Sequence, residues 1–168
     1  MITRRSLFTA AGGGLLLSAC QEPITQDGRF PIMDVLGVLS DVSDFRAALR
    51  RADLDTLLSG PGPFTVFAPT NGAWAAAPAN YRNGDAAALR NLIAAGRLRL
   101  PDIAARGNKV RMLSGIDVHV VGGTPTEPRI QAARAGAAPS GASGSIIRPN
   151  ILCSNGIIHV VGAVLIPA

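Results

Sequence analysis

The feature that most constrains the fold is a run at residues 62–74, which reads Gly-Pro-Phe-Thr-Val-Phe-Ala-Pro-Thr-Asn-Gly-Ala-Trp. Residues 64–68 favour a β-strand, because aromatic and β-branched side chains are enriched in strands. Pro69 cannot donate to a sheet ladder, so the strand should end there. Thr70 is a preferred residue type for capping the helix that follows. The run therefore predicts a strand that passes directly into a helix, which fixes the angle between two layers of the fold.

A second informative run closes the chain at residues 155–167. Asn155 and Gly156 predict a tight turn, and about ten nearly unbroken apolar residues follow them. Such a run is typical of a strand that is buried on both faces. His159 interrupts the apolar residues, and a buried neutral imidazole needs hydrogen-bond partners for its nitrogens. We expect His159 to hold neighbouring backbone or a loop in place rather than to act as a ligand or catalyst.

The two runs resemble the two signatures of fasciclin-like domains. The resemblance rests on the segments 65–71 and 155–161, followed by 164–167, and its motif residues are Thr65, Phe67, Pro69, Thr70, Asn155, Gly156 and His159. It implies an α+β fold, a mixed β-sheet wedge of about seven strands with helices packed at one side. We expect this domain over residues 30–168.

One part of the resemblance is missing near Gly96. Fasciclin-like domains commonly carry a Tyr-His pair just before this glycine, and that pair has been discussed as an adhesion determinant. Aligned on Gly96, this chain has Asn91 and Leu92 at the two places. A partner contact attributed to that pair is therefore not transferred to this chain. We expect Leu92 to fill the space that the imidazole would occupy.

Residues 1–20 have the basic start, short apolar middle and small residues of a secretory signal. The segment 17–20, Leu-Ser-Ala-Cys, resembles a bacterial lipobox, in which Cys20 becomes the lipidated first residue. A plain cleaved signal with an incidental cysteine is the alternative. The pair at residues 4–5 fits a twin-arginine export signal and an ordinary basic start about equally. We predict a signal peptide with lipobox at 1–20, a tether at 21–29, and lipid anchoring at the periplasmic face or outer membrane of a bacterial envelope.

Charge and cysteine content narrow the remaining function classes. The net charge of +5 falls to +3 without Arg4 and Arg5, the two charged residues of residues 1–20. The other arginines are scattered with few aromatic residues between them, whereas a nucleic-acid surface needs clustered charge and stacking platforms. If Cys20 is lipidated, Cys153 has no disulfide partner. We expect Cys153 to be a small buried apolar residue rather than a reactive thiol.

Periodicity divides the rest of the domain into short elements. Helical spacing predicts helices over 32–39 and 43–52, an apolar stripe continuing through residue 58, and a helix over 85–93 that Gly96 stops. Alternation from Lys109 onward predicts a hairpin, followed by strands at 129–132, 146–152 and 156–166. Residues 135–144 are rich in Gly, Ala and Ser, which predicts a surface loop between strands.

The sequence offers few groups for catalysis or metal binding. Two histidines exclude a three-histidine metal site, and no zinc-like ligand spacing occurs. Asp117 and His119 would share one strand face and could supply two ligands, but a polar outer face of a half-buried hairpin is the expected explanation. The serines at 140–145 do not have Gly-x-Ser-x-Gly spacing. We therefore predict no catalytic residue, no cofactor and no metal.

Two functions of different class are consistent with this pattern. The first is a lipid-anchored, non-enzymatic interaction or adhesion module that binds a protein or cell-surface partner, as the resemblance implies. It predicts an exposed apolar patch with a polar rim. The alternative is a periplasmic protein that binds a small apolar ligand. It predicts an enclosed apolar cavity lined by Phe67, Trp74 and Met112.

Overall fold

The computed structural model describes residues 28–140 and 143–168. The predicted signal peptide and lipobox at 1–20, with Cys20, lie outside the described residues. So does the predicted tether at 21–29, except for its last two residues.

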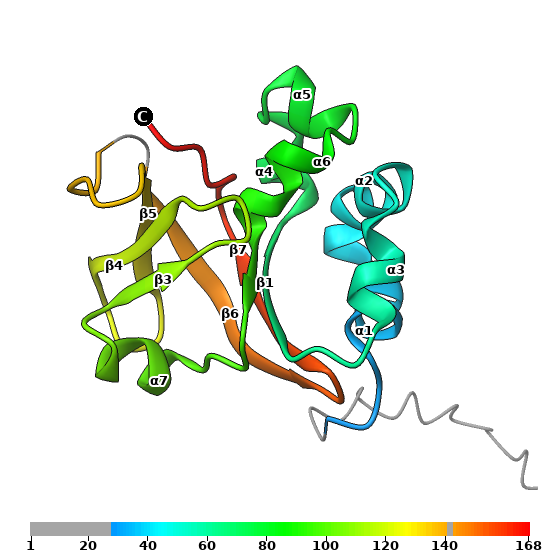
Figure 1. The fold of residues 1–168 in the computed structure, drawn as a ribbon, viewed down its shortest axis with the longest axis horizontal. Helices are drawn as coiled ribbons and strands as arrows, with labels where there is room; N and C mark the ends of the chain where they lie inside the picture. Colours follow the sequence, from blue (N-terminus) through cyan, green and yellow to red (C-terminus); the bar gives the residue numbers. More distant parts are fainter. Residues whose placement is uncertain (1–27, 141–142) are drawn as a thin grey trace, which may run out of the picture.

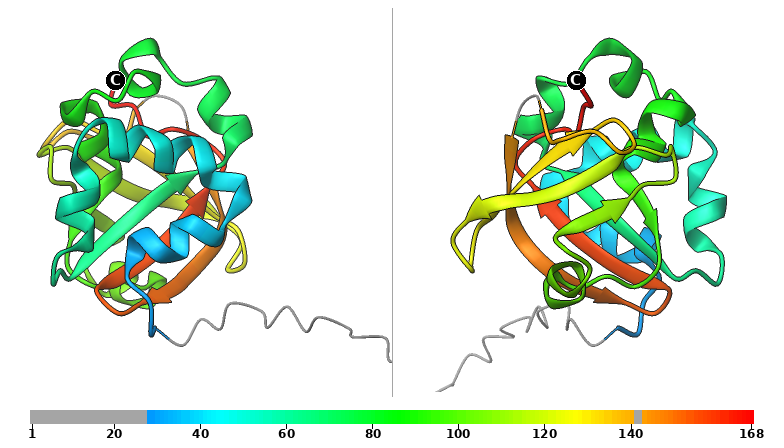
Figure 2. Two further views of the ribbon diagram at one scale, coloured as in Figure 1. Left: turned by 90° about the vertical axis from the view of Figure 1, so that its right-hand side faces the viewer. Right: turned by 60° about the vertical axis from the view of Figure 1, so that its left-hand side comes forward.

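Within the described residues, seven strands form one sheet in the order β2-β1-β7-β6-β5-β4-β3 (Figure 1). The strands are β1 (Phe64–Pro69), β2 (Ile93–Ala95), β3 (Lys109–Arg111), β4 (Asp117–Gly123), β5 (Pro128–Ala133), β6 (Ser143–Cys153) and β7 (Gly156–Val161). Strands β1 and β7 are parallel, and the other neighbouring pairs are antiparallel. The sheet curves until its two edge strands meet at a bridge between Ala94 and Met112, so that it nearly closes into a barrel (Figure 2).

Short helices accompany this sheet. They are α1 (Ile32–Val38), α2 (Ser43–Arg51), α3 (Leu54–Ser59), α4 (Asn71–Ala75), α5 (Ala79–Arg82), α6 (Ala86–Leu89) and α7 (Leu100–Ala105), with 3₁₀ turns η1 (Ser40–Val42) and η2 (Arg90–Leu92). Helices α1, α2 and α3 lie together beside β1 and β7, while α7 lies at one end of the barrel near β3 (Figures 1 and 2). The predicted α+β fold, a mixed sheet with helices at one side, is confirmed.

The runs at residues 62–74 and 155–167 supply the two strands at the centre of the molecule. All six residues of β7 are buried, and so are residues 65–69 of β1. The helices α1, α2 and α3 cover one side of this strand pair, and the barrel interior lies on the other (Figure 1). On the helical side, Phe45 meets Trp74 edge to face, with ring centroids 5.6 Å apart. Burial on both sides explains the nearly continuous apolar character of β7.

The predicted helix over residues 85–93 is wrong in its second half. Helix α6 ends at Leu89, and after η2 the chain forms strand β2, in which Ile93 pairs with Val66 of β1. Apolar residues at 89, 92 and 93 fit a helix face as well as the end of one turn and the start of a buried strand. The free edge of β1 decides between the two, because it supplies hydrogen bonds to an extended backbone.

Other boundaries also differ from the predictions. Strand β6 begins at Ser143, before the expected residue 146, and β7 ends at Val161 rather than 166. The predicted loop does lie between strands, and its residues 135–140 are exposed, whereas residues 141 and 142 lie outside the described residues. The helix α7 was not predicted, because it is only six residues long and contains Pro101 in its first turn.

Candidate functional site

Thr65 is the first residue of the signature segment 65–71, and its buried side chain connects β1 to the segment after β2. Its hydroxyl donates to the carbonyl of Gly96 over 2.7 Å and accepts from the backbone amide of Leu98 over 2.9 Å. The side chain thus satisfies two polar backbone groups in the segment that follows β2, which would otherwise be buried without partners. Its role in this geometry is structural.

The end of β1 is built from Pro69 and Thr70. Pro69 pairs with Val161 of β7 and is buried, and the amide of Thr70 donates to the Val161 carbonyl over 3.0 Å. The Thr70 hydroxyl accepts from the amide of Ala73 at 3.3 Å, so it caps helix α4. These contacts fix the direct passage from strand to helix.

Asn155 connects the β6–β7 hairpin to the helices. Its Oδ1 accepts from the amide of Ile32 at 2.9 Å, and its Nδ2 donates to the carbonyls of Leu58 and Gly60 at 2.7 and 2.8 Å. The side chain therefore holds the start of α1 and the end of α3 against the hairpin. The predicted turn is displaced by one residue, since Cys153 pairs with Gly156 and leaves Ser154 and Asn155 between them.

Gly156 is required by close approach rather than by the turn. A Cβ atom at this position would lie 2.0 Å from the carbonyl oxygen of Phe64 and 2.8 Å from Cδ1 of Ile32. A backbone oxygen cannot move away as a flexible side chain can. The glycine therefore permits the contact between β7, β1 and α1.

His159 is fully buried in β7 and engages both ring nitrogens. Nε2–H donates to the carbonyl of Leu98 over 2.9 Å, and Nδ1 accepts from the amide of Asn150 over 3.2 Å. The ring stacks on Phe67 with a centroid distance of 5.2 Å. Burial lowers the pKa of His159 to about 4, despite the opposing effect of the Leu98 hydrogen bond. The neutral ring thus has no free nitrogen for a metal ion or for proton transfer.

Asp117 is not part of a polar outer face, and this prediction was wrong. Its side chain is fully buried, with Oδ1 lying 2.5 Å from Nε of Arg111 and Oδ2 3.3 Å from Nζ of Lys109. The amide of Gly136 also donates to Oδ2 over 3.0 Å. Burial raises the pKa of this carboxyl, but the hydrogen bonds from Gly136, Arg111 and Lys109 together hold it below its ordinary value. The loop after β5 supplies the cover that the alternating pattern could not indicate.

His119 does not join Asp117 in a ligand set. Its ring is partly buried, and Nε2 has no hydrogen-bond partner among the described residues. Over residues 28–140 and 143–168, no group of three His, Cys, Asp or Glu residues is placed to hold a metal ion.

Cys153 lies fully buried at the end of β6. Burial raises the pKa of its thiol to about 12, against a smaller lowering effect of Arg97. The thiolate is the reactive form of cysteine, so the protonated thiol of Cys153 is unreactive. The expected small buried residue is confirmed.

Asn91 and Leu92, which replace the Tyr-His pair, make contacts within the domain. Leu92 is fully buried, and Asn91 Nδ2 donates to the hydroxyl of Tyr81 over 2.5 Å. That hydroxyl in turn donates to the carbonyl of Leu165 over 3.0 Å. The site of the pair thus helps to hold the C-terminal segment on the sheet.

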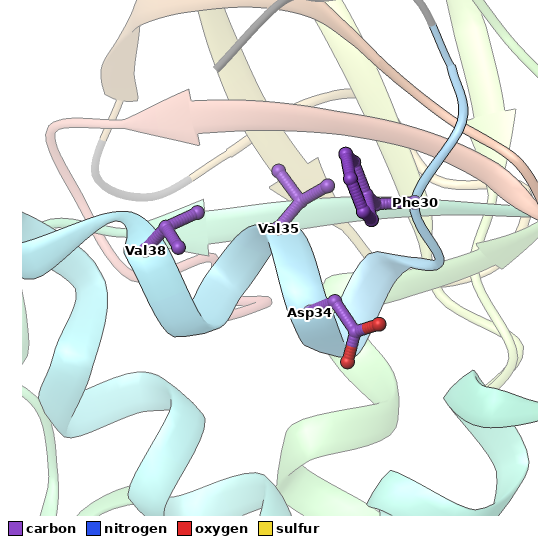
Figure 3. A pocket seen from close by; sticks show the side chains of 4 residues that line it. All are labelled: Phe30, Asp34, Val35 and Val38. Atoms are coloured by element: carbon purple, nitrogen blue, oxygen red, sulfur yellow. The ribbon is translucent and has the colours of Figure 1, made fainter. Parts of the chain in front are cut away.

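A surface pocket of about 300 Å³ lies along α1 (Figure 3). Phe30, Val35 and Val38 form a row along one side of the helix, while Asp34 points to another side. Phe30 and Val38 are 53% and 55% exposed, more than any other large apolar side chain of the described residues. Neither residue was singled out from the sequence, although a phenylalanine just before a helix start was a usable signal.

The cavity expected for a carrier of apolar ligands is not this pocket. Phe67 and Trp74 are both buried in the core, and neither lines the α1 pocket. Met112 lines a second pocket, of about 370 Å³, between β2 and β3, together with basic side chains and without Phe67 or Trp74. The three residues predicted to share one cavity therefore do not line either pocket together.

Among the described helices, none has the length and hydropathy that crossing a membrane requires.

The sequence of this chain is similar to that of known proteins. The family model described as "Fasciclin domain" matches residues 40–167. Protein sll1483 of Synechocystis sp. is 30% identical over 163 residues, covering 89% of this chain and 81% of that protein. Transforming growth factor-beta-induced protein ig-h3 of Sus scrofa is 28% identical over 148 residues, which span 81% of this chain but 19% of that protein.

A solved structure shows the same fold. It is that of a FAS1 domain pair from the insect cell adhesion molecule fasciclin I. The TM-score is 0.58 at 21% sequence identity, over 74% of this chain and 45% of that chain.

Proposed function

The chain belongs to the fasciclin domain family, and from this premise we propose that it is a non-enzymatic interaction module, anchored by lipid at the cell envelope, that binds a protein through the exposed side of α1. Fasciclin domains generally serve adhesion and interaction. To that general role the proposal adds the α1 face as the binding surface, a protein as the partner and the cell envelope as the location.

Two exposed apolar side chains, Phe30 and Val38, carry the proposal. They lie at the two ends of the row along α1, and the buried side chain of Val35 lies between them (Figure 3). Neighbouring large apolar side chains at the surface mark interaction sites, because their exposure to water is unfavourable. Covering one such side chain contributes about 1.5–3 kcal/mol. Asp34 at the edge provides a polar rim that can select the partner's orientation.

The internal use of the ionisable groups supports a role without catalysis. A catalytic site needs a titratable group that faces a cleft and is free to react. Both ring nitrogens of His159 are hydrogen-bonded to backbone groups. The carboxylate of Asp117 contacts two cationic side chains and a backbone amide. These groups stabilise the fold in their present contacts.

The proposed anchor would keep this face near a membrane. Cys20 precedes Gly28, the first described residue, by eight positions. An extended chain spans roughly 3.3–3.6 Å per residue, so the link reaches roughly 30 Å. A partner of the domain is therefore sought in the same envelope layer.

Capture from envelope extracts tests the proposal. The immobilised domain, beginning at Gln21, is compared with a Phe30→Ser/Val38→Ser variant. A Val121→Ser/Ile147→Ser variant is the matched control, since these two apolar residues are exposed elsewhere. We expect a protein that is retained by the unchanged domain and by the control but not by the α1 variant. Equal retention by the α1 variant would exclude this face, and a copurifying small molecule without any protein would favour a carrier.

A further inference from the structure

The place where the barrel closes carries a second pocket. Strands β2 and β3 meet at the Ala94–Met112 bridge, and the amide of Leu113 donates to the carbonyl of Ile93 over 2.7 Å. Beside this seam lies the pocket of about 370 Å³, within the size range of small-ligand sites. We call it the seam pocket. Leu98, Val110 and Met112 are buried side chains that contribute apolar surface to it.

Three cationic side chains line the same pocket. Arg106 stands at the end of α7, and Lys109 and Arg111 stand on one face of β3. The contact of α7 with β3 brings them together (Figure 1). Cations that share a small pocket repel one another, so their convergence there favours an anion. The sequence showed these residues only as scattered positive charges.

Asp117 fixes two of these cations without blocking them. Its buried carboxylate binds Nε of Arg111 and Nζ of Lys109, as described above. The side chains of Lys109 and Arg111 nevertheless stay 43% and 57% exposed, and each has more N–H donors than Asp117 uses. The carboxylate therefore holds both cations in place before any ligand arrives, which lowers the entropy lost on binding. Arg106 has no ion-pair partner among the described residues.

The charge of the seam pocket selects a class of ligand. Three cations and one buried carboxylate leave two net positive charges. A phosphate monoester carries about −1.5 to −2 charges near neutral pH and has three strong acceptor oxygens. The buried apolar side chains that line the same pocket can contact the organic part of such an ester. From this arrangement we propose that the seam pocket binds a phosphate monoester, with Arg106, Lys109 and Arg111 as the donors.

Such a group can belong to a soluble molecule or to a lipid headgroup, and the experiment separates the two. The full chain with Cys20→Ser, which lacks the predicted acylation site, is titrated by calorimetry with phenyl phosphate and with phenol. The same protein is sedimented with phosphatidylcholine vesicles that contain or lack phosphatidic acid, whose headgroup is a phosphate monoester. Each measurement is repeated with Arg106→Gln and Lys109→Gln, and with Arg50→Gln as the control. Arg50 is exposed on α2, outside the pocket.

We expect binding of phenyl phosphate but not of phenol, and binding that weakens as salt rises. A charged hydrogen bond is lost in Arg106→Gln or Lys109→Gln, so each should weaken binding about tenfold, whereas Arg50→Gln should not change it. Binding only to vesicles with phosphatidic acid, with the same dependence on Arg106, would support the site and identify the headgroup as its source. The proposal is overturned if neither probe binds, or if Arg106→Gln and Arg50→Gln bind alike. Neither result depends on the α1 face.

Discussion

At the scale of single residues, His159 joins three segments that are far apart in the sequence. From β7 its ring reaches the carbonyl of Leu98 on one side and the amide of Asn150 on the other, and it stacks on Phe67. Removal of the ring leaves a cavity and takes the partner from one buried and one partly buried backbone group. Each of these effects is destabilising.

The first prediction concerns this loss. His159→Ala should lower the free energy of unfolding by about 3 kcal/mol, measured by urea denaturation. His119→Ala is the matched control, because His119 is only partly buried and its Nε2 has no partner. His119→Ala should lower the free energy of unfolding by clearly less than His159→Ala. Unchanged unfolding of His159→Ala would remove the structural role assigned to this ring.

The second prediction is a dependence of stability on pH. The pKa of His159 is about 4 in the folded chain against an ordinary value of 6.5, so the unfolded chain binds its proton first as the pH falls. The contribution of His159 to stability is therefore complete above pH 6.5. Below that it is lost by about 1.4 kcal/mol per pH unit, to a total of about 3 kcal/mol near pH 4.

Urea denaturation at several pH values between 7 and 4 measures this slope. A His159→Gln variant, which cannot titrate, should lose it. The carboxyl of Asp117 affects stability only near the acidic end of this range, because its pKa is lowered from its ordinary value and its contribution is lost as the pH falls further. Equal slopes in the two proteins would show that His159 is not the group responsible.

The sequence allowed a correct expectation for His159 but not for Asp117. A polar residue within a long apolar run must be satisfied internally, so the run itself indicated the role of His159. Asp117 lies in an alternating segment, where its position indicates solvent. The loop at Gly136 contributes to its burial, and this loop is distant in sequence and has no large apolar residue to indicate where it packs.

At the scale of elements, helix α2 is capped by a side chain from another helix. Oδ1 of Asn71 in α4 accepts from the amide of Asp44 over 3.1 Å. Its Nδ2 donates to the carbonyl of Ser40 over 3.0 Å and to the hydroxyl of Ser43 over 3.1 Å. Ser43 and Asp44 are themselves residue types that commonly cap a helix. The structure shows no side-chain cap from the residue that precedes α2.

The third prediction follows from this contact. Asn71→Ala should lower the free energy of unfolding by about 1 kcal/mol, the usual contribution of a helix cap, in a thermal or urea experiment. Asn83→Ala provides the control, since Asn83 is exposed at the end of α5 and should change stability by less than about 0.5 kcal/mol. Equal effects of the two substitutions would show that the contact across the helices is too weak to matter.

At the scale of the whole molecule, a lipid anchor at Cys20 would determine where the domain works. The fourth prediction is that Cys20→Ser releases the protein from membranes, because the acyl chains supply the affinity for lipid. Membrane pellets and supernatants of expressing cells are compared by immunoblot. Cys153→Ser is the control, as Cys153 is buried in the domain. If the Cys20 variant pellets as before, the assignment of a lipid anchor is wrong.

The sequence by itself determined the two central strands, the helix start at Thr70 and the family, because each depends on neighbours a few residues apart and on the spacing of apolar side chains. Tertiary structure decided how the chain closes. It made Ile93–Ala95 a strand rather than a helix end, buried Asp117 under a loop, and gathered Arg106, Lys109 and Arg111 around one pocket. These outcomes depend on strand pairing and on contacts between distant segments, and periodicity along the chain does not encode them.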